Sequence, residues 1–132
     1  MTGPVRGERG NVSLFIVLLL PALLLAAGLV LDGGRQIQTR REAQGHAAAA
    51  ARAAVQLGPS EVYGRRLDAG LAVGRAQAEL SVHGANGAVS VAGEAVTVTV
   101  TASVDYLILP GGRTVRQSST AIPVDGVTGG SP

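Results

Sequence analysis

The sequence predicts an α+β protein in which a long N-terminal helix is followed by a short second helix and a small antiparallel β meander of three or four strands. Two observations support this fold. A run without any charge, 12–31, is followed by an alanine-rich stretch of strong helix formers. Valine and threonine then alternate over 96–101, which is typical of a strand with one buried and one exposed face. The spacing of apolar residues therefore changes from the period of a helix to the period of a strand.

The charge-free run is long enough to cross a bilayer. The hydrocarbon core is about 30 Å thick and a helix rises about 1.5 Å per residue, so roughly 20 apolar residues are sufficient. We therefore expect a transmembrane helix over 12–31, with a kink near Pro21. A short leader before a span is typical of a start-transfer signal, so we expect 1–11 to be cytoplasmic and the C-terminal part to be extracytoplasmic.

Beyond the run, helix-forming sequence continues to a stop signal at Gly58-Pro59. We predict one nearly continuous helix from about 12 to 57, in which 32–58 continues outside the bilayer. Small residues at helical spacing form a stripe suited to close packing by a sheet or a second helix. High helix propensity alone is the alternative explanation. The stripe consists of Ala43, Ala47, Ala50, Ala51 and Ala54.

The end of the span carries a second group of candidate residues. Asp32 and Arg35 lie three apart, so we expect them to pair on one helical face and to anchor the helix at the headgroups. Plain interfacial charges are the alternative. With Pro21 and Gly34 they form our candidate set for membrane exit and helix packing.

The remainder, 59–124, is predicted to be a small external α+β domain. Over 65–80, Leu67, Leu71 and Ala78 can share one face of a short amphipathic helix. The composition of 125–132 predicts a disordered tail.

Two turns are predicted in the meander. Asn86-Gly87 indicates a hairpin between short strands near 80–84 and 88–91. Gly111-Gly112 indicates a second turn, between a strand ending near Leu109 and a strand over about 114–124.

Composition argues against most chemistry. The chain has no cysteine, which excludes disulfides and thiolate sites, and its basic residues are scattered arginines, which does not favour nucleic-acid binding. His46 and His83 lack a second ligand at metal spacing. The hydroxyl cluster of Ser118, Ser119 and Thr120 has no credible base nearby. We expect no enzyme activity, no cofactor and no small-molecule substrate.

Several stretches together resemble TadE/TadG-like proteins, the minor pilin-like components of the tight-adherence, Flp-type pilus machinery. The similarity lies in an Arg-Gly before the span, a Leu-rich span with a proline, an Asp-x-Gly-Arg exit, an alanine-rich helix and an apolar segment after the Val-Thr alternation. The residues are Arg9-Gly10-Asn11-Val12, Leu18-Leu19-Leu20-Pro21, Leu31-Asp32-Gly33-Gly34-Arg35 and the helix to Ala54, with Leu107-Ile108-Leu109-Pro110-Gly111-Gly112.

This resemblance implies a single-span envelope protein whose partners are the membrane and other pilin-like subunits or pilus assembly platform proteins. It also implies a candidate processing site between Gly10 and Asn11. Processed pilins of this type carry Glu at the fifth position after the cleaved glycine, where this chain has Phe15. In this the chain is more similar to the TadG branch, which keeps its span as an anchor. The alternative is a secreted or cell-surface binding domain whose signal peptide is cleaved near Ala26-Ala27-Gly28.

Overall fold

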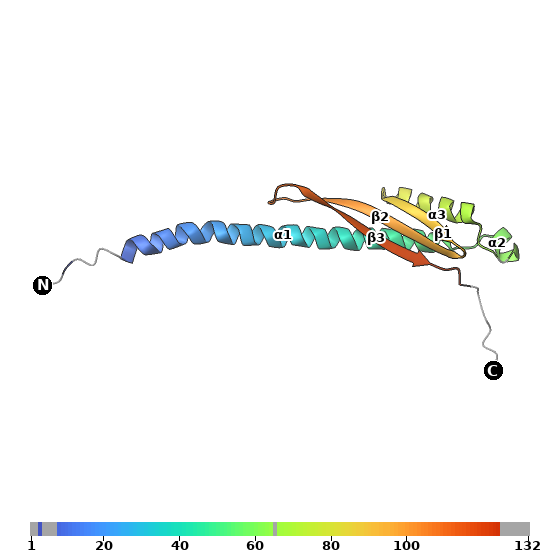
Figure 1. Cartoon of the computed structure of the whole chain (residues 1–132), viewed down its shortest axis with the longest axis horizontal. Helices are drawn as coiled ribbons and strands as arrows, with labels where there is room; N and C mark the ends of the chain where they lie inside the picture. The colour runs from blue at the N-terminus through green and yellow to red at the C-terminus, as the bar shows by residue number, and fades with distance from the viewer. Residues whose placement is uncertain (1–2, 4–7, 65, 125–132) are drawn as a thin grey trace, which may run out of the picture.

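A single helix dominates the computed structural model, which describes residues 3, 8–64 and 66–124 (Figure 1). Helix α1 spans Glu8–Ala54 and continues through Pro21 without a break. The predicted continuous helix is thus confirmed, although it begins and ends a few residues earlier than expected. The predicted tail, 125–132, lies outside the described residues.

The sheet is a three-stranded antiparallel meander in the order β1-β2-β3. Strand β1 spans Asn86–Ala92, β2 spans Ala95–Asp105 and β3 spans Gly112–Ala121. Along β2 the side chains of Val96, Val98 and Val100 are buried, as the alternation predicts. On the other face, threonine hydroxyls of β2 face hydroxyls of β3. The oxygens of Thr97 and Thr120 lie 2.8 Å apart, and those of Thr99 and Ser118 lie 2.9 Å apart.

The core lies between the C-terminal half of α1, the sheet and α3. All five alanines of the stripe are at most 2% exposed, and they form one cluster with the valines of β2 and with Ala72, Ala76 and Leu80. Figure 1 shows the sheet and α3 gathered on the C-terminal half of α1, whereas most of its N-terminal half is uncovered. Alanine allows this close approach because its side chain ends at the β-carbon.

Two short helices, rather than one, connect α1 to the sheet. Helix α2 spans Pro59–Gly64 and α3 spans Ala69–Val82. The first turn of α3 is capped by Asp68, whose carboxylate accepts a hydrogen bond from the Leu71 N–H at 3.0 Å. The predicted apolar face of this segment is wrong, since Leu71 is 48% exposed and Ala78 is also exposed. The buried face instead carries Ala72, Ala76 and Leu80, because small residues spaced four apart let α3 approach α1.

The predicted hairpin at Asn86-Gly87 is also wrong, because residues 80–84 end a helix rather than form a strand. Gly84 adopts a φ of +60°, its N–H donates to the Ser81 carbonyl at 3.1 Å, and the Ala85 N–H donates to the Leu80 carbonyl at 2.9 Å. These two bonds are a Schellman C-cap. The turn between β1 and β2 lies at Gly93-Glu94, where Gly93 has a φ of +62°.

Asn86 and Gly87 lie inside β1, opposite Thr101 and Val100. A β-carbon on Gly87 would come within 2.8 Å of the Leu80 side chain and 3.0 Å of the Thr99 carbonyl oxygen. The glycine therefore serves close packing between α3 and the sheet rather than a turn.

The second predicted turn lies at the expected place but is longer. Strand β2 ends at Asp105 instead of near Leu109, and β3 begins at Gly112 and ends at Ala121. Residues 106–111 form the connecting loop, which is called the β2–β3 loop below. Its backbone makes contacts that explain the early end of β2.

Candidate functional site

The β2–β3 loop is bound to α1 by one buried carboxylate. Asp32 is 1% exposed, and both of its oxygens accept hydrogen bonds from successive backbone N–H groups of the loop. Leu107 donates to Oδ1 at 2.8 Å, whereas Ile108 and Leu109 donate to Oδ2 at 3.2 and 3.1 Å. We call this group of bonds the Asp32–loop contact. It joins residues far apart in the sequence and explains why the chain leaves the sheet at Asp105.

The electrostatics of the contact favour the ionised carboxylate. Burial alone would raise the pKa of Asp32, which lies just beyond the charge-free run. The three backbone donors and, less strongly, the charge of Arg35 outweigh burial and hold the pKa below its ordinary value of 3.8. Charge-assisted hydrogen bonds of this kind are stronger than bonds between neutral groups.

The predicted pairing of Asp32 with Arg35 is not formed. Arg35 is exposed, and no ion pair joins the two side chains, both of which are described. The physical reason is competition for acceptors. Three unpaired N–H groups of a loop require an acceptor, whereas an arginine at the surface is already solvated by water.

A close backbone contact lies one helical turn before Asp32. A β-carbon on Gly28 would come within 2.6 to 2.9 Å of three carbons of the Ile108 side chain, so only glycine fits there without displacing the loop. Gly28 is buried although its neighbours along the charge-free run are exposed. Sequence reasoning did not identify Gly28 in this role. The available signal was its spacing of four from Asp32, which puts both on one helical face.

The other candidate residues at the N-terminal end and the exit lie away from the folded part. Gly10, Asn11, Pro21 and Gly34 are all exposed. Added β-carbons on Gly10 and Gly34 would meet nothing within 4 Å. The processing site and the packing between subunits therefore stay predictions, and these residues are free to face other molecules.

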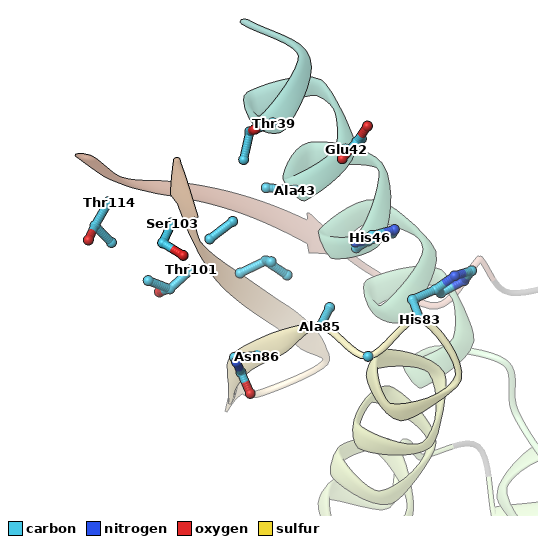
Figure 2. A pocket seen from close by; sticks show the side chains of 13 residues that line it. Thr39, Glu42, Ala43, His46, His83, Ala85, Asn86, Thr101, Ser103 and Thr114 are labelled. Atoms are coloured by element: carbon cyan, nitrogen blue, oxygen red, sulfur yellow. The ribbon is translucent and has the colours of Figure 1, made fainter. Parts of the chain in front are cut away.

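The fold brings together two histidines that the sequence separates. The rings of His46 on α1 and His83 at the end of α3 stack with centroids 4.8 Å apart, beside a cleft of about 500 Å³ (Figure 2). His83 Nε2 also lies 3.2 Å from the Glu79 carboxylate. No group of three or more metal-ligating side chains occurs in the described part of the chain. The stack joins α3 to α1.

A second buried carboxylate organises the far end of α1. Glu61 is 4% exposed, and its oxygens accept hydrogen bonds from the N–H groups of Gly58 at 2.8 Å and Asp68 at 2.9 Å. It also forms an ion pair with Arg75, whose guanidinium donates in addition to the Ala54 carbonyl at 3.4 Å. Arg75 and the two backbone donors outweigh burial and lower the pKa of Glu61 to about 2. This cluster joins the ends of α1, α2 and α3.

The Glu61 cluster predicts a specific acid sensitivity. Because the pKa of Glu61 falls from 4.5 to about 2 on folding, its stabilisation is complete above pH 4.5 and is lost as the pH falls toward 2. We expect Glu61→Gln to lower the thermal midpoint at neutral pH and to flatten its decline between pH 4.5 and 2. Melting curves followed by circular dichroism check this. Glu94→Gln, at an exposed turn, is the control, and parallel pH profiles for Glu61→Gln and the unmutated chain would contradict the assignment.

These features define a class of protein, namely an α+β protein built on one helix that is itself a candidate membrane span. By length and composition α1 can cross a membrane, and almost none of its most apolar part is buried within the chain. Residues 10–57 match the family model described as putative Flp pilus-assembly TadE/G-like. The match covers nearly all of α1 and confirms the family resemblance for this part of the chain. Comparisons with curated proteins and with solved structures gave no match.

Proposed function

We propose that the chain is a non-enzymatic, single-span envelope protein that acts as a minor pilin-like or assembly component of a Tad/Flp-type pilus or a related secretion system. The observation that carries this proposal is the coincidence of the family match with α1. The matched helix has a bare apolar half suited to a membrane and a second half that carries a folded domain.

The architecture suits a subunit whose helix is anchored in the membrane and whose folded domain lies outside it. The bare half of α1 offers apolar side chains to lipid and to the helices of neighbouring subunits. Because α1 is continuous and the Asp32–loop contact ties the sheet to it, the external domain is held in a fixed orientation to the anchor. The hydroxyl-rich face of the sheet is then available to partners outside the membrane. In this proposal the N-terminus is cytoplasmic.

Deleting the gene in its native cell tests the proposed role. We expect the number of surface pili, counted by negative-stain electron microscopy, to fall sharply, and the unmutated gene supplied in trans to restore it. A variant with unrelated apolar residues in place of 12–27, which keeps Gly28, separates anchoring from subunit-specific packing. Pili that are unchanged in number and length after deletion would contradict the proposal.

The mature N-terminus distinguishes the remaining alternatives. Mass spectrometry of the protein from native membranes should find either an intact start, as expected for an anchor, or a cut after Gly10, as expected for pilin-type processing. A cut near Gly28 would remove the span and support the secreted binding domain instead.

A further inference from the structure

The β2–β3 loop presents an apolar tip. From Tyr106 to Gly112 the chain carries no charge, although Asp105 and Arg113 flank this segment on both sides. Three successive apolar side chains at the tip are exposed: Leu107 by 60%, Ile108 by 48% and Leu109 by 40%. Adjacent exposed apolar side chains in one loop indicate a contact with something other than water.

The tip of the loop lies beside the candidate span, away from β1 and α3. In Figure 1 the hairpin of β2 and β3 extends along α1 toward the N-terminal half, beyond β1 and α3. Ile108 contacts Gly28, which lies four residues before Asp32 and hence about 6 Å further along the helix axis. Leu29, Val30 and Leu31, all exposed, belong to the same level of α1. The apolar surface of the loop therefore continues that of the span.

The backbone N–H groups of the loop have acceptors within the protein. A loop beside a membrane span is favoured when its N–H groups do not depend on water for acceptors. Asp32 accepts the N–H groups of Leu107, Ile108 and Leu109, and the Tyr106 N–H donates to the Gly111 carbonyl at 3.3 Å. Pro110 has no N–H. Every backbone donor from Tyr106 to Pro110 is thus satisfied inside the protein.

We propose that the β2–β3 loop inserts its tip into the boundary between headgroups and acyl chains of the bilayer that α1 crosses, as a second membrane contact beside the span. The inference rests on the proposed function in requiring that 12–31 lie in a bilayer. The tip contacts lipid, because it adjoins the span and lies about one helical turn from the charged end of the span, in the direction of the bilayer. Tyr106 and Arg113 lie at the edges of the segment, where aromatic and arginine side chains favour the interface.

The chain contains no tryptophan, so one introduced tryptophan reports on a single position. We would place the full chain with Leu107→Trp in phosphatidylcholine vesicles that contain lipids brominated on their acyl chains. We expect blue-shifted emission that is quenched most by bromines near the headgroups. Leu18→Trp, within the span, should be quenched most by deep bromines. Tyr63→Trp, where the side chain is 90% exposed in α2, should not be quenched.

The controls separate this inference from the proposed function. Quenching of Leu18→Trp without quenching of Leu107→Trp overturns the inference and leaves the span intact. If neither position is quenched, the span and the loop insertion are both overturned. Leu109→Trp repeats the measurement at a second tip position, and unchanged circular dichroism shows that each variant is folded.

Discussion

Replacing Asp32 with asparagine should release the β2–β3 loop from α1. The carboxylate serves three backbone donors with two acceptor oxygens, whereas an asparagine side chain has one acceptor oxygen and an amide group that would face at least one of those donors. A buried donor left without an acceptor retains its full desolvation penalty. We therefore expect this change in α1 to have a larger effect on the loop than any single substitution at an exposed position of the hairpin.

Hydrogen exchange of the loop amides measures this release directly. In detergent micelles or nanodiscs, the amides of Leu107, Ile108 and Leu109 should exchange faster by roughly tenfold or more in Asp32→Asn, since charge-assisted bonds are among the strong ones. Asp105→Asn is the matched control, because it removes the same charge beside the same loop from an exposed residue. Equal exchange in Asp32→Asn and the unmutated chain would show that the contact does not hold the loop.

Enlarging one alanine of the stripe should separate α1 from the sheet and α3. Ala47 is completely buried within the cluster that joins these three elements. Leucine at this position adds a branched side chain for which the packed core has no space. Overpacking of this kind typically costs about 1 to 3 kcal/mol. In a domain of this size, each kcal/mol corresponds to a fall of about 4 to 8 °C in the thermal midpoint.

Gln44→Leu is the control for helix propensity and added hydrophobicity. It introduces leucine into the same helix at an exposed position. Thermal unfolding followed by circular dichroism should show a clear loss of stability for Ala47→Leu and little change for Gln44→Leu. If both variants melt together with the unmutated chain, the stripe is explained by helix propensity rather than by packing.

Local patterns predicted most of the fold. The continuous helix, the buried valines of β2 and a three-stranded meander all follow from periodicity, which reports how each segment divides between core and solvent. The burial of the five alanines has the same origin, since residues at helical spacing face one side. Errors arose where two local signals competed. Asn86-Gly87 resembles a hairpin turn, but α3 extends to Val82 and ends in a Schellman cap at Gly84, inside the region predicted as a strand.

The candidate site could be predicted only in part. The sequence singles out Asp32 at the end of the span, but local spacing predicts its nearest charged neighbour, Arg35, as its partner. The actual partners lie 75 to 77 residues away, and no local pattern reports a contact at that separation. Likewise, the ion pair of Glu61 and Arg75 depends on how α2 and α3 return to the end of α1. Both carboxylates therefore have partners that only the tertiary structure brings to them.

Labelling of single introduced cysteines tests the central claim, that the first half of α1 lies in the bilayer and the second half carries the sheet outside it. The chain has no native cysteine, so each probe is unique. In intact spheroplasts, a membrane-impermeant maleimide should label Gln38→Cys and Glu94→Cys, should label Asn11→Cys only after lysis, and should not label Leu24→Cys until the membrane is dissolved. Labelling of Leu24→Cys as readily as Gln38→Cys, or of Gln38→Cys only after lysis, would contradict the account.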